Sequence, residues 1–182
     1  MKNIVITGPI GCGKTTAIKK LIQACSLKVG GFRTVPVFEG KRRRGFVIED
    51  YLAGSPLLDH RGTGMIGEFT DQNRLVANTA AFETQGVGII EKALKNHAVL
   101  VFDEVGFLER EARAFQNLVM TCLEREDLLV IMALKQREGE FFLDRIRHHE
   151  KTELFTMTPD DRDEVFEDIL AFCKRRYFNE KS

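Results

Sequence analysis

The residues of this chain best suited to chemistry run from Gly8 to Thr15, Gly-Pro-Ile-Gly-Cys-Gly-Lys-Thr. Their spacing, G-x-x-x-x-G-K-T, is the Walker A pattern, in which glycines allow successive backbone N–H groups to curl around a phosphate. The pattern predicts a nucleotide-binding loop. The residues expected to contact the nucleotide are Gly8, Pro9, Ile10, Gly11, Cys12, Gly13, Lys14, Thr15 and the adjoining Thr16.

The segments on both sides of this loop fit that role. Residues 3–7, Asn-Ile-Val-Ile-Thr, form a short apolar run of the kind found in buried parallel strands. After the loop, residues 17–25 repeat apolar side chains at helical spacing. We therefore expect the loop to end at a helix N-terminus, where unpaired N–H groups and the helix dipole favour an anion.

An acidic pair follows the apolar run 98–102, Ala-Val-Leu-Val-Phe. Asp103 and Glu104 stand at the carboxyl end of this predicted buried strand, which is the Walker B pattern. An Asp at this point can hold Mg²⁺, usually through water, while the Thr15 hydroxyl coordinates the same ion. Glu104 is placed to orient and deprotonate an attacking water. By itself an Asp-Glu pair after a strand is more typical of a solvated turn, and the phosphate loop is what favours the metal site.

Together the two motifs predict Mg²⁺-dependent hydrolysis of a nucleoside triphosphate. Charge spreads over the phosphoryl oxygens in a loose transition state, so catalysis depends on positioning and electrostatic stabilisation. We expect Lys14 along the β- and γ-phosphates and Glu104 beside the attacking water. The candidates for an arginine finger are Arg137, Arg145, Arg147 and Arg162. A surface position is the commoner role for such arginines, and the sequence does not choose among them.

Two segments interrupt the alternation of strands and helices. Residues 31–51 contain two strand-like runs around a basic turn at 41–44, which predicts a β-hairpin with Pro36 at an edge or a bulge. Residues 53–78 are rich in glycine and show no sustained period. We expect a loop with one short strand there, which could cover the nucleotide.

The remaining segments alternate regularly. Helical spacing is expected over 82–96, 112–123 and a last helix with Thr158 as N-cap and Pro159 at its first position. Buried strands are expected over 98–102 and 128–133, and a final strand over 152–157. Such alternation predicts an α/β fold, a three-layer α/β/α arrangement around a mostly parallel sheet, in a single domain spanning 1–182. In this fold ligands bind beyond the carboxyl ends of the strands.

The composition of the chain excludes several classes of protein. In 182 residues there are 27 Lys and Arg and 27 Asp and Glu, so no overall field indicates a nucleic acid or a membrane surface as partner. The four cysteines lie far apart, without metal-ligand spacing, and are expected to be free thiols, with the Cys12 thiol accessible to alkylation. No signal peptide or spanning apolar run is recognised. The expected state is a cytoplasmic monomer.

Four motifs resemble the small P-loop nucleoside-triphosphatases. They are the loop at 8–15, Gly31-Phe32 with Arg44-Gly45-Phe46, residues 103–109 (Asp-Glu-Val-Gly-Phe-Leu-Glu), and residues 158–163 (Thr-Pro-Asp-Asp-Arg-Asp). The resemblance implies slow, Mg²⁺-dependent hydrolysis of ATP, GTP and other nucleoside triphosphates to the diphosphate and phosphate. It also implies the additional-strand ATPase topology, with strand 128–133 between the loop strand and the Walker B strand. Lys14 and Thr15 would contact phosphate and metal, Asp103 the metal, and Glu104 would be the base.

The chain departs from the family pattern at some positions. Leu108 stands where the family usually has Met, Asp161 where it has Asn, and residues 54–78 match poorly. Two alternatives remain open: a small-molecule or nucleotide kinase with ATP as phosphoryl donor, and a partner-stimulated nucleotide switch. A kinase needs an acceptor site, for which the sequence shows no signature.

Overall fold

The computed structural model describes residues 2–52 and 64–179. The strands are β1 (Asn3–Gly8), β2 (Val29–Glu39), β3 (Arg42–Asp50), β4 (Met65–Phe69), β5 (Leu75–Ala77), β6 (Val99–Val105), β7 (Leu129–Lys135) and β8 (Thr152–Thr156). The helices are α1 (Lys14–Ala24), α2 (Thr79–Ala81), the π-helical η1 (Phe82–Gly86), α3 (Val87–Asn96), α4 (Arg113–Glu124), α5 (Phe141–Arg147) and α6 (Arg162–Asn179). Within these residues every helix is too short or too polar to cross a membrane.

The strands form one sheet in the order β5-β4-β3-β2-β6-β7-β1-β8. Strands β2, β6, β7, β1 and β8 run parallel to one another, whereas β3, β4 and β5 continue the sheet in antiparallel fashion. The predicted mostly parallel sheet is therefore confirmed. Because β7 pairs with both β1 and β6, it lies between the loop strand and the Walker B strand, as the family resemblance implied.

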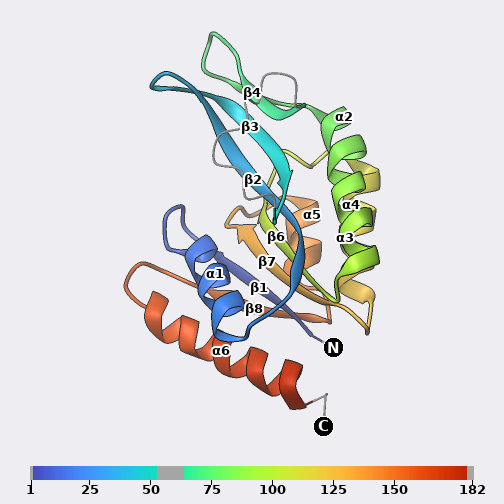
Figure 1. The fold of residues 1–182 in the computed structure, drawn as a ribbon. Coiled ribbons are helices and arrows are strands. Elements are labelled where there is room, and N and C mark those ends of the chain that lie inside the picture. Colours follow the sequence, from blue (N-terminus) through green and yellow to red (C-terminus); the bar gives the residue numbers. More distant parts are fainter. Residues whose placement is uncertain (1, 53–63, 180–182) are drawn as a thin grey trace.

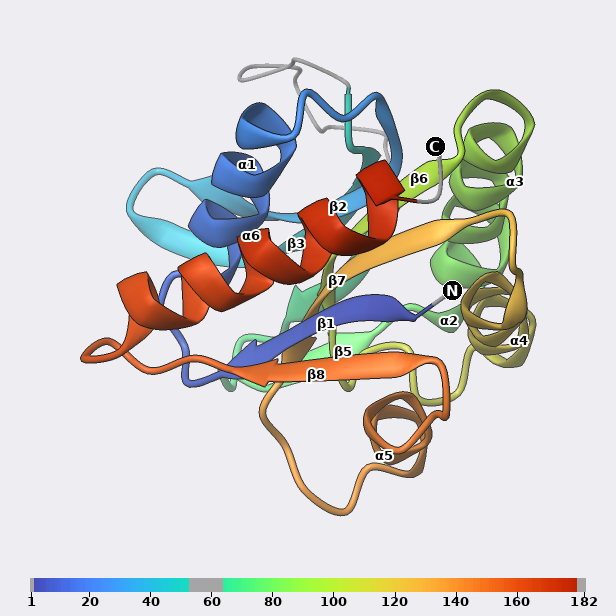
Figure 2. The same cartoon turned by 90° about the horizontal axis from the view of Figure 1, so that it is seen from below.

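Helices cover both faces of the parallel part of the sheet, which gives the expected three layers. Figures 1 and 2 show α1 and α6 on one face and α3, α4 and α5 on the other. Each helix buries one apolar stripe, for example Ile18 and Ile169 on the first face and Ile90, Phe115 and Leu143 on the second. Central strands β6 and β7 contribute side chains to both cores, which explains their uninterrupted apolar sequences.

The predicted hairpin is formed by β2 and β3, which extend the sheet at the upper end of Figure 1. Pairing of β2 with β6 ends at Arg33, and Pro36 lies beyond it, so its missing N–H removes no bond from that ladder. The register of the hairpin shifts between Val37 and Phe38, one residue after Pro36. Gly31 has a positive φ of 113°, and a Cβ there would lie 2.1 Å from the Val101 carbonyl oxygen. Only glycine fits where β2 meets β6.

Three expectations for the elements were wrong. The segment before residue 79 contains two short strands, β4 and β5, instead of one; residues 53–63 of that segment lie outside the described residues. Helix α5 was not predicted, because its seven residues are too few to show a helical period. Helix α6 begins at Arg162 instead of Pro159. The Asp161 carbonyl accepts the first helical N–H, that of Val165, at 2.9 Å. The Asp161 Oδ1 accepts the Thr158 N–H at 2.7 Å, which is the return bond of a capping box, so these two residues close the turn that leads into the helix.

Candidate active site

The Walker A and Walker B motifs, 88 positions apart in sequence, meet at the carboxyl edge of the sheet. The Thr15 hydroxyl donates a 2.9 Å hydrogen bond to the Asp103 Oδ1. The Lys14 Nζ lies 3.4 Å from the Glu104 Oε1. The structure thus brings together the four side chains to which the sequence assigned metal, phosphate and water.

The loop from Gly8 to Thr15 owes its shape to three glycines with positive φ, which is 149° at Gly8, 81° at Gly11 and 113° at Gly13. A Cβ on Gly8 would lie 2.0 Å from the Met157 carbonyl oxygen, because the chain leaving β8 passes directly beside the loop. The buried Lys14 ammonium donates to the carbonyl oxygens of Gly8 at 3.0 Å and Pro9 at 3.3 Å. Its side chain therefore folds back over its own loop.

The expectation that the Cys12 thiol is accessible was wrong. The side chain is fully buried and packs in the apolar core beneath α1 and α6, because the loop turns this residue toward the sheet. All four cysteines are free and buried, which agrees with the predicted free thiols. The Cys12 backbone N–H donates to the Pro9 carbonyl at 3.3 Å and remains part of the loop.

Glu104 is held from three directions. Its carboxylate lies between Lys14 at 3.4 Å and Lys135 at 3.9 Å, while the Thr34 hydroxyl donates to its backbone carbonyl at 3.3 Å. Lys135 is the last residue of β7, and its Nζ also lies 5.0 Å from the centre of the Phe107 ring. Two ammonium groups therefore hold a partly buried carboxylate in a fixed position.

Glu109 is a second carboxylate at the same edge. Its side chain is fully buried, and both carboxylate oxygens lie 3.2 Å from the Gly106 N–H. Burial raises the pKa of Glu109 to about 7, although the Gly106 N–H and the charge of Lys135 oppose this shift. Burial also raises the pKa of Asp103, and the hydrogen bond from Thr15 opposes it.

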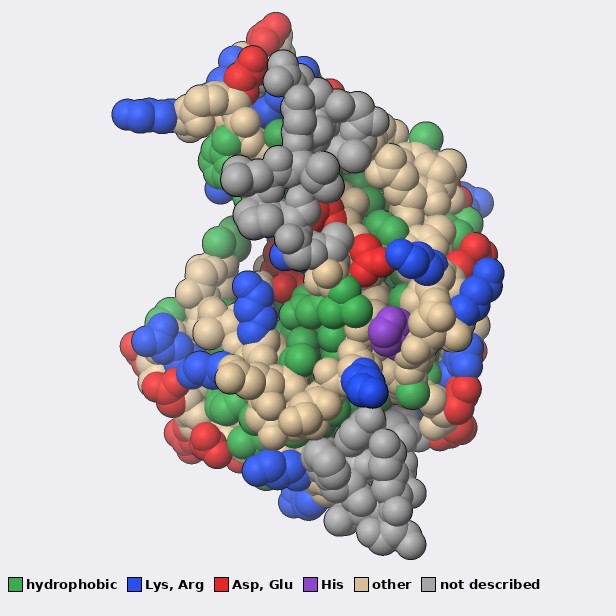
Figure 3. All heavy atoms as spheres, in the orientation of Figure 1, with side chains coloured by type: hydrophobic (Ala, Val, Ile, Leu, Met, Phe, Trp, Pro, Cys, Tyr) green, Lys and Arg blue, Asp and Glu red, His purple; other side chains and the backbone are tan. Residues whose placement is uncertain are grey.

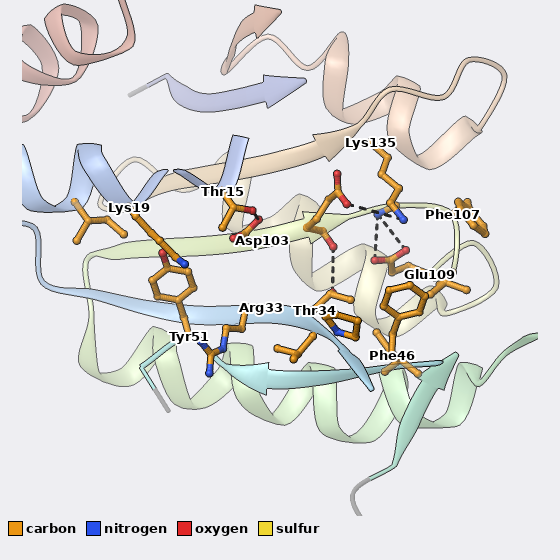
Figure 4. A pocket seen from close by; sticks show the side chains of 17 residues that line it. Thr15, Lys19, Arg33, Thr34, Phe46, Tyr51, Asp103, Phe107, Glu109 and Lys135 are labelled. Atoms are coloured by element: carbon orange, nitrogen blue, oxygen red, sulfur yellow. Dashed lines mark hydrogen bonds and ion pairs between the residues drawn. The ribbon is translucent and has the colours of Figure 1, made fainter. Parts of the chain in front are cut away.

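A cavity of about 530 Å³ opens beside these carboxylates, between α1 and the hairpin. In Figure 3 the outline of the molecule is notched between the hairpin and the body. Figure 4 shows Lys19, Tyr51 and Arg33 at one end of this cavity, Phe46, Phe107 and Lys135 at the other, and Thr15 and Asp103 between them. We call this space the Glu104 cavity.

A smaller cavity of about 140 Å³ lies on the other side of the loop. It is lined by Gly13, Thr16 and Lys20, and by Arg162 and Phe166 at the start of α6. We call it the Arg162 cavity. Of the four arginines considered from sequence, Arg162 is the one beside the loop.

The other three arginines have partners outside the loop. Arg137 lies 4.7 Å from the ring centre of Phe107, which lines the Glu104 cavity, and Arg145 lies 5.8 Å from the Phe141 ring centre. Arg147 donates to the carbonyl oxygens of Lys135 and Arg137 at 2.8 Å. Arg145 and Arg147 thus lie at α5, and Arg137 lies beside the Phe107 end of the Glu104 cavity.

The oxygen atoms at the edge fit a hard divalent cation. Among the described residues no group of three or more His, Cys, Asp or Glu forms a protein-only metal site. Thr15 and Asp103 offer two adjacent oxygens, which suits Mg²⁺, since this ion typically takes few protein ligands and completes its shell with water and phosphate oxygens.

Comparison with known proteins agrees with this geometry. The family described as NTPase matches residues 3–170, nearly the whole chain. The chain belongs to the NTPase family. Both motifs, the central sheet and the start of α6 lie within the matched range.

The relatives in the NTPase family cover almost the full chain. "Nucleoside-triphosphatase THEP1" of Thermofilum pendens is 33% identical over 89% of this chain and 90% of its own length. THEP1 of Aquifex aeolicus is 28% identical over 94% and 99%, and its crystal structure superposes with a TM-score of 0.70 over 96% of this chain and all of that one. The solution structure of a human cancer-related nucleoside triphosphatase, 23% identical, has the same fold, with a TM-score of 0.71 over 97% and 99% of the two chains.

Two residues of this NTPase-family site were missed from sequence alone. Lys135 was not considered, although a charged residue directly after a long apolar run could have indicated it. Glu109 entered only as part of the pattern at 103–109, without a role. Its burial depends on the turn after β6, which brings the carboxylate back beneath Gly106.

Proposed function

We propose that this protein hydrolyses the terminal phosphoryl group of nucleoside 5′-triphosphates in a Mg²⁺-dependent reaction at the Gly8–Thr15 loop. The observation that carries the proposal is the joining of the two motifs, Thr15 to Asp103 at 2.9 Å and Lys14 to Glu104 at 3.4 Å. The names of the relatives, nucleoside-triphosphatases, support the same reaction.

The loop and Lys14 bind the phosphates. Loop N–H groups surround the α- and β-phosphates, and Lys14 leaves the Gly8 and Pro9 carbonyls to lie along the β- and γ-phosphates. Thr15 and Asp103 would hold Mg²⁺, which would supply positive charge against the charge that develops on the phosphate oxygens. The raised pKa of Asp103 reflects a buried carboxylate without a full counter-charge, as expected at a cation site.

Glu104 acts on the attacking water. Its carboxylate accepts a proton from the water as the oxygen bonds to the γ-phosphorus and the bond to the diphosphate breaks. Lys14 and Lys135 hold the carboxylate from opposite sides, so the base is in place before the nucleotide arrives. Because the nucleotide would be bound through its phosphates and the metal, the site would discriminate little between nucleobases. We therefore include both ATP and GTP among the substrates.

The test follows phosphate release from Mg-ATP and Mg-GTP by the purified protein. Glu104→Gln should lower kcat about 100-fold or more, the usual scale for a general base, and still bind nucleotide. Lys14→Ala should weaken binding and turnover together. Chelation of Mg²⁺ should abolish turnover.

Glu138→Gln is the matched control, because it makes the same change at an exposed site. If wild type releases no phosphate, the hydrolase proposal fails. Hydrolysis by Glu104→Gln at the wild-type rate would contradict the role of Glu104 alone.

A further inference from the structure

The Glu104 cavity lies at the γ-phosphate end of the candidate nucleotide site. It is lined by Thr15, Asp103 and Glu104, the groups assigned to the metal and the attacking oxygen. The Arg162 cavity contacts Gly13 and Thr16 and none of those groups, so it lies at the opposite end of the phosphate chain. The nucleoside of a bound triphosphate therefore has a place outside the Glu104 cavity.

The Glu104 cavity is far larger than hydrolysis requires. Its volume is about 530 Å³, whereas a water molecule occupies roughly 30 Å³. Cavities that bind small molecules are typically about 300–1,000 Å³. The space beside Glu104 is thus sufficient for a second substrate.

The walls of the Glu104 cavity differ along its length. Half-buried Phe46 and Phe107 form an aromatic end, with the Lys135 Nζ 5.9 Å and 5.0 Å from their ring centres. Tyr51, Arg33 and the exposed Lys19 form the other end (Figure 4). Glu104 also lines the cavity and directly follows Asp103, which lies between the two ends in Figure 4. The aromatic end suits a planar ring, the Lys19 end suits an anion, and the middle suits a hydroxyl that gives up a proton.

We propose that the Glu104 cavity binds a phosphoryl acceptor with a free hydroxyl, a planar ring and an anionic group, the chemistry of a nucleoside 3′-monophosphate. The base, the 5′-hydroxyl and the 3′-phosphate of this molecule extend in three directions from its ribose. They match the aromatic end, Glu104 and the Lys19 end. The inference rests on the proposed function, since the same Glu104, loop and nucleotide are used.

The reaction is a transfer from the nucleoside triphosphate to the acceptor. The 5′-oxygen forms a bond to the γ-phosphorus, and the bond between that phosphorus and the β–γ bridging oxygen breaks. Glu104 takes the hydroxyl proton, and the nucleoside diphosphate leaves. The products are a 5′-phosphorylated acceptor and the diphosphate, and water gives phosphate in the acceptor's absence.

The test uses full-length protein, Mg²⁺ and ATP labelled at the γ-phosphate, with labelled phosphate and labelled acceptor separated afterwards. The acceptors are the four ribonucleosides, their 3′-monophosphates and their 5′-monophosphates. We expect label on the 3′-monophosphates, less on the nucleosides, and none on the 5′-monophosphates. A dinucleotide with a free 5′-hydroxyl distinguishes a free mononucleotide from the end of a strand. We expect no label on the dinucleotide, because a cavity for one nucleotide excludes the second unit.

Lys19→Ala tests the anionic end. The preference for 3′-monophosphates over nucleosides should fall about tenfold or more, the value of one charge-assisted contact. Lys95→Ala, which removes an exposed lysine from α3, should keep the wild-type preference.

The outcomes separate the two proposals. Labelled phosphate with no labelled acceptor overturns the acceptor proposal and leaves hydrolysis intact. Labelled acceptor without phosphate release overturns hydrolysis as the activity and supports transfer. Label on the 5′-monophosphates contradicts the 5′-hydroxyl as the acceptor group, and an unchanged preference in Lys19→Ala contradicts the assigned anionic end.

Discussion

Glu104 and Glu109 line the same cavity, but their surroundings give them different properties. Glu104 is partly exposed, and its two carboxylate oxygens lie 3.4 Å from the Lys14 Nζ and 3.9 Å from the Lys135 Nζ. Glu109 is fully buried and accepts the Gly106 N–H. Because transfer of a carboxylate out of water is costly, burial raises the pKa of Glu109 to about 7. Glu104 is thus reached by solvent from the cavity, whereas Glu109 shapes the turn after β6.

Glu109 should make the stability of the protein depend on pH. Its pKa is raised from 4.5 to about 7 in the folded state. The folded state therefore binds the proton more tightly than the unfolded state, and this contribution to stability is complete below pH 4.5 and is lost as the pH rises through 7. The free energy of unfolding should fall by about 3 kcal/mol from this residue over that range. Urea denaturation between pH 5 and pH 8 measures the change.

Glu109→Gln should remove this pH dependence, because its amide oxygen still accepts the Gly106 N–H and does not titrate. Glu138→Gln, which changes an exposed carboxylate, should retain it. An identical pH dependence in wild type and Glu109→Gln would contradict a raised pKa.

At the scale of elements, Asn3 fixes the amino end of β1. Its buried side-chain amide donates to the carbonyls of Leu123 at 2.9 Å and Lys151 at 3.1 Å, and its oxygen accepts the Val130 N–H at 2.9 Å. These bonds join β1 to the end of α4, to β7 and to the turn before β8. Since β1 leads directly into the Gly8 loop, the bonds of Asn3 fix the position of the strand that carries the loop.

Asn3→Ala should destabilise the protein by about 2–4 kcal/mol, because the Leu123 carbonyl and the Val130 N–H lose their side-chain partner, whereas the Lys151 carbonyl keeps the Asn3 backbone N–H at 2.6 Å. The midpoint of chemical denaturation measures the loss. Lys2→Ala, which removes an exposed ion pair with Glu153 at 2.9 Å, should cost less than about 1 kcal/mol. Equal losses in the two variants would show that the Asn3 bonds contribute little.

The sequence predicted those elements whose stability is local or whose burial is complete. Strands β6 and β7 are continuous apolar runs, and the loop after β1 has a spacing that few other structures require. The contacts of Asn3 and Lys135 could not be predicted, because each depends on which strands become neighbours. Similarly, the start of α6 at Arg162 was not predicted, because residues 158–161 form a turn, closed by the bond from the Thr158 N–H to the Asp161 carboxylate, before the helix begins.

At the scale of the whole molecule, the candidate nucleotide site joins parts that are distant in sequence. The loop connects β1 with α1 on one face of the sheet, and Asp103 comes from β6 two strands away. The Arg162 cavity adds the start of α6 to the same site. An unfolded chain cannot keep these groups together. A triphosphate that contacts all of them should therefore bind the folded state alone and stabilise the entire domain.

We expect Mg-ATP at about 100 times its Kd to stabilise Glu104→Gln, which binds without fast turnover, by about 2.7 kcal/mol. For a domain of this size the melting temperature should rise by about 5–10 °C. Mg-AMP should cause little change, because it lacks the phosphates that Lys14 and the Thr15–Asp103 pair would contact. The double variant Lys14→Ala, Glu104→Gln should lose most of the shift at the same ATP concentration.

An equal shift with AMP, or a full shift without Lys14, would show that the loop does not bind the β- and γ-phosphates. A shift that does not depend on Mg²⁺ would contradict the assignment of Thr15 and Asp103 as metal ligands.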